Sequence, residues 1–377
     1  MRKRTWLVGL PLCGALLASC GPKLNPNEIR IGEYGSLTGS QATFGISTQN
    51  GIQLAVDEVN AAGGVNGKTL KVMVLDDQGK PEEAAVAVTK LITEDKAQVI
   101  LGEVASSLSL AAAPICQQHK VPMITPSSTA TQVTQVGDYV FRVCFIDPFQ
   151  GQVMADFSMG SLKAKTAAIF RDQKSDYSMG LANAFIKRFT EKGGTIVIDQ
   201  SYVAGDVDFK SQLTTIREKK PDVIFVPGYY TEVGLIVQQA RELGIKAPFM
   251  GGDGWDSSKL YEIGGKALDG CYFSSHYSPQ STDPKVQEFV KKYQAKFGQV
   301  PDALATLGYD AVGVLVAALK NAKSLGGPDI RDAIAATKNY AGVTGSISLD
   351  ADRNAVKPAV VLKISGGKAG FVTMVNP

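Results

Sequence analysis

The feature of this chain that most constrains its fold is an alternation of short apolar strands with helical segments, and this alternation occurs twice. The first block covers residues 29–125 and the second covers 166–251. Short apolar strands separated by helices are typical of parallel sheets with both faces covered. Two such blocks in 377 residues predict an α/β protein with two doubly wound parallel-sheet lobes.

The pattern assigns individual elements to each block. The first block has predicted strands at 29–36, 70–75, 99–104 and 121–125, with helices at 48–61, at 81–94 and from Ser106 onward. The second has strands at 166–170, 195–202, 222–226 and 249–251, with helices at 177–192, 209–219 and 232–243. The last third has helical patterns at 284–297, 302–322 and 330–336 and strand-like runs at 346–349, 359–364 and 371–375. We expect these last pieces to complete the two lobes.

The N-terminus has the pattern of an export signal. Basic residues at 2–4 precede an apolar run at 6–18, which is shorter than the roughly 20 residues of a membrane-spanning helix. The run ends in Leu-Ala-Ser-Cys at Cys20, which resembles a bacterial lipobox. We expect a lipoprotein signal peptide at 1–19 and a lipidated Cys20 with a short tether at 20–27. An ordinary signal peptide with an incidental cysteine is the alternative.

Such a signal implies an exported protein that is anchored by lipid at the cell envelope, either in the periplasm or at the outer face of the membrane. Several acyl chains give stable attachment, whereas a single chain gives only marginal binding. Three further cysteines, Cys116, Cys144 and Cys271, cannot all pair within one chain. We interpret them as small buried hydrophobic residues.

The charge and the motif content exclude several classes of protein. The net charge of +3 lies within the basic residues 2–4, so the exported part is balanced, unlike a nucleic-acid binder with its concentrated basic surface. Neither His119 nor His276 belongs to a metal-ligand or triad motif. No nucleophile elbow is present, and Ala62 stands where a phosphate loop ending at 67–69 would need its first glycine. We therefore expect no metal, no cofactor, no nucleic-acid partner and no enzymatic activity.

Hydroxyl-bearing residues follow two neighbouring strands of the first block. Ser106 opens a helix after one strand, and Ser127, Ser128 and Thr129 follow the next. Free N–H groups at a helix N-terminus and serine hydroxyls suit a carboxylate, and ligands of doubly wound sheets bind beyond the carboxyl ends of the strands. Plain helix capping explains each cluster taken alone, but two clusters at neighbouring strand ends favour a site.

Aromatic and acidic residues occupy the corresponding places in the second block. Tyr177, Tyr229, Asp253 and Trp255 follow three of its strands. Turn chemistry and surface packing are the alternatives for each of them. Taken together, hydroxyls and amides for an anion, a carboxylate for a cation and aromatic walls predict a site for a zwitterion with an apolar side chain, which is an amino acid.

At these residues the chain resembles the substrate-binding proteins of branched-chain amino acid ABC transporters, in the type I periplasmic binding protein group. The resemblance covers nearly the whole chain after the signal. It rests on the order and spacing of the stretches 31–38 (IGEYGSLT), 51–67 (GIQLAVDEVNAAGGVNG), 102–109, 121–129 and 228–241 (GYYTEVGLIVQQAR).

The resemblance implies roles for the polar residues. Ser106 would bind the ligand carboxylate through its hydroxyl and amide, and Thr129 would meet the carboxylate with its N–H and the ammonium with its hydroxyl. A backbone carbonyl from Ser127 or Ser128 would accept from the ammonium. Asp253 stands where an acidic residue binds the α-ammonium.

The resemblance also implies the walls of the pocket. Tyr229 matches a tyrosine that closes over the ligand, and Tyr177 and Phe44 stand at aromatic pocket positions. Phe44 lacks a hydroxyl that some members carry there, and Trp255 adds bulk near the acidic residue. These departures leave the head-group site intact, whereas the preference for a particular side chain stays open.

The family fold has three crossovers, which form a three-strand hinge with the ligand cleft between the lobes. We expect the crossovers near Asp147, His276 and Ala355. The first lobe would then comprise residues 28–146 plus 277–355, and the second 147–276 plus 356–377.

The resemblance implies a monomeric, lipid-anchored solute-binding protein that captures a hydrophobic, branched-chain amino acid by hinge closure and delivers it to an ABC transporter permease. One alternative is a receptor-type module of the same fold for an amide, a short peptide or an aromatic acid. Another is an enzyme such as an amidohydrolase. A ligand that lacks the amine separates the first two, and turnover of the bound ligand identifies the third.

Overall fold

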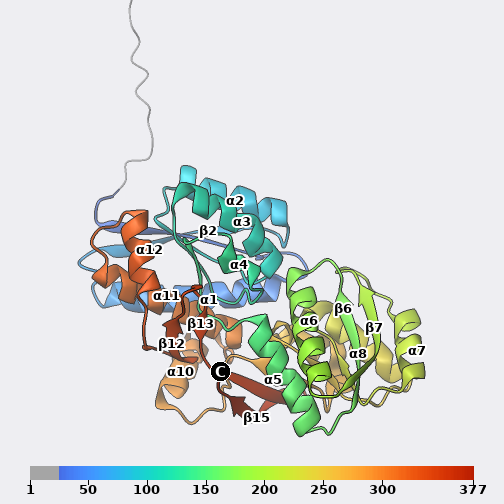
Figure 1. The fold of residues 1–377 in the computed structure, drawn as a ribbon. Coiled ribbons are helices and arrows are strands. Elements are labelled where there is room, and N and C mark those ends of the chain that lie inside the picture. The colour runs from blue at the N-terminus through green and yellow to red at the C-terminus, as the bar shows by residue number, and fades with distance from the viewer. Residues whose placement is uncertain (1–24) are drawn as a thin grey trace, which may run out of the picture.

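Two separate sheets organise the protein, and each forms the centre of one lobe (Figure 1). The computed structural model describes residues 25–377. The predicted signal peptide and the predicted lipid site Cys20 lie outside the described residues. Two α/β lobes with covered parallel strands confirm the fold class that the alternation of strands and helices predicts.

The first lobe contains a five-stranded parallel sheet in the order β2-β1-β3-β4-β5. Its strands are β1 (Glu28–Gly35), β2 (Thr69–Asp76), β3 (Val99–Leu101), β4 (Met123–Thr125) and β5 (Val140–Arg142). The helices between them are α1 (Ala42–Ala61), α2 (Pro81–Thr93), α3 (Ser106–His119) and α4 (Gln132–Gln135). Alternate residues of β1 face opposite cores: Ile31 packs with the cluster under α1, and Tyr34 packs with the cluster under α2 and α3.

The second lobe contains a seven-stranded sheet in the order β15-β14-β10-β9-β8-β6-β7. Its strands are β6 (Thr166–Asp172), β7 (Thr195–Tyr202), β8 (Val223–Phe225), β9 (Phe249–Gly251), β10 (Tyr272–Ser275), β14 (Ala359–Ser365) and β15 (Lys368–Val375). Its helices are α5 (Asp147–Gly160), α6 (Asp176–Glu191), α7 (Lys210–Lys219), α8 (Tyr230–Glu242), α9 (Ser258–Gly264) and the short turns η1 (Asp253–Trp255) and η2 (Gly265–Leu268). β14 runs antiparallel to β10, and β15 runs antiparallel to β14, so this sheet is mixed.

The chain returns to the first lobe before it ends in the second. The returning elements are α10 (Pro284–Phe297), α11 (Ala303–Asn321), α12 (Gly327–Ala335) and the small antiparallel sheet of β11 (Tyr340–Gly342), β12 (Gly345–Leu349) and β13 (Ala355–Val356). Among the helices from residue 25 onward, α11 is the one that is long and apolar enough to cross a membrane. Most of its apolar stretch is buried in the first lobe, where Leu307 and Leu315 pack with Ile52 of α1.

Several elements of the fold differ from the sequence pattern, and for three of them the physical reason is clear. α1 begins at Ala42, ahead of the predicted start at 48, and its first turn lacks apolar periodicity because Gly45 lies directly against the backbone of Ser36. α5 was not predicted: Phe149, Val153 and Phe157 lie at helical spacing on it, but the polar residues Gln150 and Ser158 are buried among them and weaken the apolar pattern. β10 is short and ends in two serines, which is a weak strand pattern.

The chain passes between the two sheets three times. It leaves the first sheet between β5 and α5, returns to the first lobe between β10 and α10, and crosses again between β13 and β14. Figure 1 shows the last strands, in red, beside the green helix α5 of the second lobe. The first crossing ends at Asp147 and the second begins at His276, and both residues lie beside the site described below.

The lobes contact each other on either side of these crossings. The hydroxyl of Ser107 in α3 donates to Asp176 Oδ2 of α6 at 2.7 Å, and the N–H of Asp176 donates back to it at 3.2 Å. The hydroxyl of Thr231 donates to the carbonyl of Ser40 at 2.8 Å. The backbone N–H of Ala303 in α11 donates to Asp256 Oδ2 at 3.1 Å. The lobes are therefore closed on one another.

This last contact brings two acidic side chains together. Asp302 caps α11 by accepting from the N–H of Ala305 at 2.9 Å, and Asp256 reaches the same helix terminus from the second lobe. Burial, together with the neighbouring carboxyl of Asp302, raises the pKa of Asp256 to about 7. The folded protein therefore binds a proton here over a pH range in which the unfolded chain, with an ordinary aspartate pKa of about 3.9, has lost it.

This linkage predicts that Asp256→Asn stabilises the protein, and more at pH 8 than at pH 5. A carboxyl whose folded-state pKa is raised destabilises the fold progressively as pH rises through the window between about 4 and 7. Melting temperatures at the two pH values measure the difference. As a control, Asp222→Asn removes an exposed carboxylate whose pKa is lowered by the N–H groups of Lys165 and Thr166, so it should lower the melting temperature at pH 8. A gain for Asp256→Asn that does not depend on pH would contradict this account.

Candidate ligand-binding site

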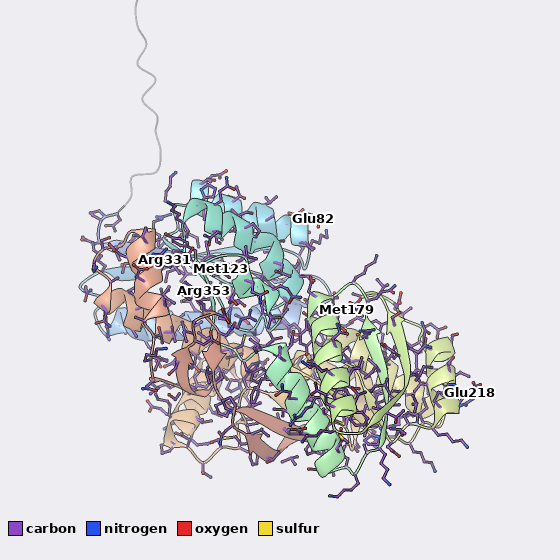
Figure 2. The ribbon with its side chains drawn as sticks, in the orientation of Figure 1. Glu82, Met123, Met179, Glu218, Arg331 and Arg353 are labelled. Atoms are coloured by element: carbon purple, nitrogen blue, oxygen red, sulfur yellow. The ribbon has the colours of Figure 1, made fainter. Side chains whose placement is uncertain are left out.

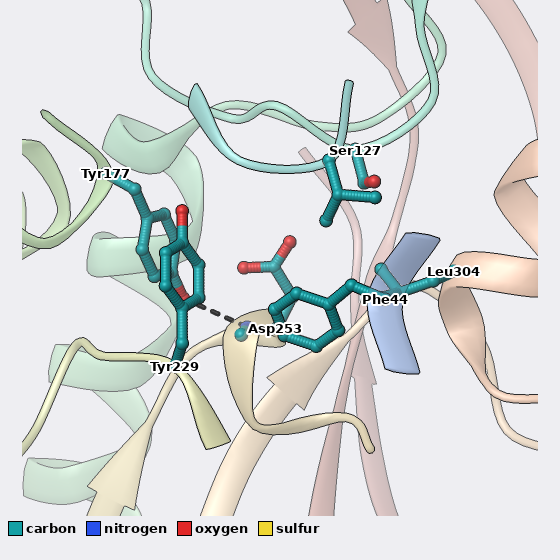
Figure 3. Close-up of a pocket in the computed structure, with 8 residues that line it drawn as sticks. Phe44, Ser127, Tyr177, Tyr229, Asp253 and Leu304 are labelled. Carbon is teal, nitrogen blue, oxygen red and sulfur yellow. Dashed lines mark hydrogen bonds between the residues drawn. The ribbon is translucent and has the colours of Figure 1, made fainter. Parts of the chain in front are cut away.

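A small cavity lies between the two lobes, and each lobe contributes four residues to its wall (Figure 3). Side chains from both lobes fill most of the space between them, so the cavity is narrow. The lining residues are Phe44, Val104, Ser127 and Leu304 from the first lobe and Tyr177, Tyr229, Asp253 and Gly254 from the second.

The first-lobe wall is built where β3 and β4 end side by side. Hydrogen bonds tie the two loops together: the carbonyl of Glu103 accepts from the hydroxyl of Thr125 at 2.6 Å and from that of Ser128 at 2.9 Å. The hydroxyl of Ser109 in α3 lies 2.7 Å from that of Ser128. These bonds hold the first turn of α3 next to the loop of Ser127, so that the free N–H groups of the helix start close to the cavity.

A buried arginine fixes the same loop from behind. Arg142 of β5 donates to the carbonyl of Ser128 at 2.6 Å and to that of Ala130 at 2.8 Å. The N–H of Ala130 in turn donates to the hydroxyl of Ser106 at 3.2 Å. The loop between β4 and α4 is therefore held rigidly over the N-terminus of α3, which is the arrangement that anion binding by backbone N–H groups needs.

The second-lobe wall is aromatic. The rings of Tyr177 and Tyr229 stack with centroids 5.1 Å apart and an interplanar angle of 5°, and Phe44 meets Tyr229 edge-on at 5.5 Å across the cleft. Figure 3 shows the stacked pair on one side of the cavity and Phe44 with Leu304 on the other. The hydroxyl of Tyr177 accepts from the N–H of Gly254 at 3.1 Å, which links the stack to the turn that carries Asp253.

Asp253 supplies the carboxylate of the cavity. Its side chain is only 5% exposed, and its Oδ2 lies 3.0 Å from Nε2 of His276. Its backbone N–H donates to Oε1 of Gln150 at 2.7 Å. Among the residues that the structure describes, its Oδ1 has no hydrogen-bond partner although it is buried. A buried carboxylate oxygen is costly without a partner, so this atom is suited to a cationic ligand group.

A second acidic group lies behind the first-lobe wall. Asp147 begins α5, its N–H donates to the carbonyl of Thr129 at 3.0 Å, and its carboxyl lies beside the hydroxyl of Thr129. Burial raises the pKa of Asp147 to about 8. Buried hydroxyls of Ser127 and Thr129 have no partner within residues 25–377. The first wall thus offers two free hydroxyls beside the carboxylate from the second wall.

The structure brings most of the sequence-predicted residues together. Phe44, Ser127, Tyr177, Tyr229 and Asp253 line the cavity directly. Ser106 begins α3 and Thr129 lies in the loop after β4; both are buried without lining the cavity, and the hydroxyl of Ser106 accepts from the N–H of Ala130.

Two of the predicted residues do not line the cavity and make other contacts. The indole of Trp255 is fully buried, donates from Nε1 to the carbonyl of Val226 at 2.9 Å and stacks on Phe273, so it packs in the second-lobe core, and its contact with a ligand stays a prediction. Both the hydroxyl and the carbonyl of Ser128 are used internally, by Glu103 and by Arg142, so its contribution is to hold the loop.

Sequence reasoning missed several residues of the site. Val104 and Leu304 are ordinary core residues by pattern, and Gly254 is the glycine of a turn. Gln150 lies in the helix that was not predicted. His276 and Asp147 were singled out only as crossover positions, although a polar residue at a crossover next to the cleft is itself a signal. Between residues 25 and 377 the structure contains no cluster of three or more His, Cys, Asp or Glu side chains that could hold a metal ion.

The comparisons agree with this geometry. The sequence profile of the periplasmic binding protein family matches residues 28–369, so the chain belongs to that family of extracytoplasmic solute-binding proteins. A Leu/Ile/Val-binding protein from Rhizobium johnstonii is 33% identical over 79% of this chain and 80% of its own length. Within the family, the chain belongs with the branched-chain amino acid substrate-binding proteins of ABC transporters.

Solved structures give the same result. A leucine-binding protein from Thermotoga maritima is 41% identical with a TM-score of 0.89, covering 93% of this chain and 99% of its own. A branched-chain amino acid transporter substrate-binding protein from Streptococcus pneumoniae, in complex with isoleucine, is 38% identical with a TM-score of 0.88, covering 93% and 100%. An ABC transporter solute-binding protein from R. palustris, in complex with benzoate, is 26% identical with a TM-score of 0.84, covering 93% and 97%.

The close approach at Gly254 predicts a sensitive position. A Cβ at this residue would lie 2.8 Å from the carbonyl oxygen of Gly228 and 2.9 Å from Cδ1 of Tyr229, so Gly254→Ala must displace the turn or the tyrosine. We expect a loss of about 1–3 kcal/mol in the free energy of unfolding, measured by urea denaturation. Gly160→Ala is the control, because its Cβ would meet nothing within 4 Å, and its change should stay within about 0.5 kcal/mol. Equal effects of the two substitutions would show that the turn is not packed as described.

Proposed function

We propose that this protein captures a hydrophobic, branched-chain amino acid outside the cytoplasm and delivers it to an ABC transporter permease. The observation that supports this most directly is the composition of the cavity wall. One carboxylate with a free oxygen, Asp253 Oδ1, faces a wall of aromatic and aliphatic side chains, and hydroxyls lie opposite. A zwitterion with an apolar side chain satisfies all three surfaces at once.

In the proposed complex, the α-ammonium of the ligand binds Asp253 Oδ1 and the hydroxyl of Thr129. The α-carboxylate binds the N–H groups at the start of α3 and the hydroxyls of Ser106 and Ser127, where the positive end of the helix dipole favours an anion. The side chain of the ligand packs against Phe44 and Tyr229. The relatives named for leucine, isoleucine or valine, or solved with isoleucine, cover most of this chain.

Hinge closure is the proposed mechanism. We assign residues 28–146 plus 277–355 to the first lobe and 147–276 plus 356–377 to the second, with hinges near Asp147, His276 and Ala355. The ligand touches both walls, so it stabilises the closed form in proportion to the contacts that exist only there. The bond between Ser107 and Asp176 is one such contact of the closed form.

The rest of the proposal concerns the membrane anchor and the release of the ligand. Lipid on Cys20 would anchor the protein at the envelope through a short tether, so that a monomer stays near its permease. The family is one of solute-binding proteins, and we propose that the ligand is released unchanged, without catalysis.

A second candidate is an aromatic or other carboxylic acid that lacks an amine. The structural similarity to the R. palustris protein with bound benzoate supports it, and so do the stacked tyrosines. The free oxygen of Asp253 argues against it, because an acid without an amine would leave that oxygen unpaired and would bring two negative charges together.

The test is calorimetry of the mature protein with the branched-chain amino acids and with benzoate, after a thermal-shift screen of all amino acids. We expect L-leucine, L-isoleucine or L-valine to raise the melting temperature and to bind more tightly than benzoate. Asp253→Asn should weaken amino acid binding by about 10- to 100-fold, because it removes a charge-assisted bond to a desolvated ammonium.

Asp208→Asn is the matched control, since Asp208 is exposed and its side chain accepts only from the N–H of Lys210. That variant should bind like the wild type. Tighter binding of benzoate than of any amino acid, or unchanged amino acid affinity in Asp253→Asn, would overturn the proposed function.

A further inference from the structure

The two oxygens of the Asp253 carboxylate differ in their surroundings. Its Oδ2 lies 3.0 Å from Nε2 of His276, whereas its Oδ1 is buried without a partner in the described part of the chain. The side chain of His276 is 0% exposed and that of Asp253 is 5% exposed, so both groups are shielded from bulk water. Because His276 occupies Oδ2, Oδ1 is the oxygen that remains for a ligand.

His276 is itself fixed in position. It follows β10 at the point where the chain leaves the second sheet for α10, and its ring stacks on Phe145 with centroids 3.8 Å apart and an interplanar angle of 21°. Phe145 lies just before α5, at another crossing between the lobes. The imidazole is thus held between two crossing segments, and the ring cannot rotate away from Asp253 without moving one of them.

The backbone of Asp253 is fixed by an independent contact. Oε1 of Gln150 accepts from the N–H of Asp253 at 2.7 Å and from the hydroxyl of Ser274 at 2.7 Å. The main chain of the turn is therefore set by Gln150, and the rotation of the carboxylate is set by His276. One contact therefore fixes where Asp253 lies, and the other fixes how its carboxylate oxygens are oriented.

The charge of the pair depends on the surroundings of the imidazole. Burial lowers the pKa of His276 to about 4, and Lys357 acts in the same direction, while Asp253 acts in the opposite one. These are the charged groups that act on the ring, Lys357 from the segment between β13 and β14 and Asp253 from η1. His276 is therefore neutral at physiological pH. A neutral imidazole that faces a carboxylate oxygen carries its proton on that nitrogen, so Nε2–H is the donor.

We propose that His276 is a positioning residue for amine recognition: its Nε2–H bond to Oδ2 turns Oδ1 of Asp253 into the cavity and leaves the negative charge of the carboxylate for the ammonium of the ligand. This inference rests on the proposed function and adds the group that gives the site its preference for amine-bearing acids. A charged imidazolium at this place would neutralise Asp253 and repel the ammonium. Amino acid affinity should thus fall as pH falls through the pKa of His276.

The first experiment compares two variants with two probes. His276→Gln keeps an N–H donor toward Asp253, whereas His276→Leu removes it and keeps an apolar side chain against Phe145. The probes are L-leucine and 4-methylpentanoic acid, which has the same side chain and carboxylate but no amine. Calorimetry gives the dissociation constant of each probe for each variant.

We expect His276→Leu to bind L-leucine about 10-fold or more weakly, with 4-methylpentanoic acid changed by less than about threefold. His276→Gln should recover most of the L-leucine affinity. Equal loss for both probes, or full L-leucine affinity in His276→Leu, would overturn the proposal. If the wild type binds neither probe, the proposed function fails, and the selection of an amine fails with it.

The second experiment needs no ligand and no variant, so it stands even if His276→Leu does not fold. The chain has only two histidines, and His119 is exposed at the end of α3, which makes it an internal reference. Nitrogen-15 NMR of the imidazoles should show His276 as the neutral Nε2–H tautomer down to pH 5. A tautomer with the proton on Nδ1, or titration of His276 near the ordinary value of about 6.5, would overturn the assigned geometry.

Discussion

The closed structure depends on a carboxylate that is enclosed between two lobes with one oxygen unpaired. Desolvation of an ion costs several kcal/mol even after the protein relaxes, and that cost is recovered only when a cation and further hydrogen bonds meet the charge. His276 supplies a hydrogen bond to Oδ2 of Asp253 but supplies no charge, because burial keeps its imidazole neutral. The second lobe therefore carries a negative charge that a ligand can neutralise, which is the physical basis for a site that closes on an ammonium.

The rest of the fold serves to bring a complementary wall to that carboxylate. Parallel strands place their carboxyl ends on one edge, and the loops after β3 and β4 therefore meet beside the start of α3. Arg142 and the network around Glu103 fix those loops, so the groups that would meet the ligand carboxylate are preorganised before binding. Preorganisation reduces the conformational entropy that binding costs. In the proposed mechanism, the three crossings allow the two walls to separate and meet as rigid units.

Much of this arrangement could be predicted from the sequence, for reasons that are local. Strand and helix periodicity indicated both sheets, and hydroxyl, aromatic and acidic residues at strand ends indicated the place of the site. The parts that could not be predicted depend on three-dimensional packing. The apolar pattern of α5 is weakened because the polar residues Gln150 and Ser158 are buried on it, and Trp255 stands two residues from Asp253 yet turns its indole to Val226. The pairing of His276 with Asp253 joins residues 23 positions apart on separate loops, and no sequence pattern reports it.

The most direct test of the account is energy transfer between dyes on the two lobes. Glu82 in α2 and Glu218 in α7 are exposed and lie on different lobes (Figure 2), while Cys116, Cys144 and Cys271 are buried. Dyes on Glu82→Cys and Glu218→Cys, with Cys20→Ser, therefore report the distance between the lobes. The account predicts that L-leucine increases the transfer and that 4-methylpentanoic acid does not at the same concentration. Binding of L-leucine without any change in transfer, or equal closure with both compounds, would contradict the claim that an ammonium between the lobes stabilises the closed form.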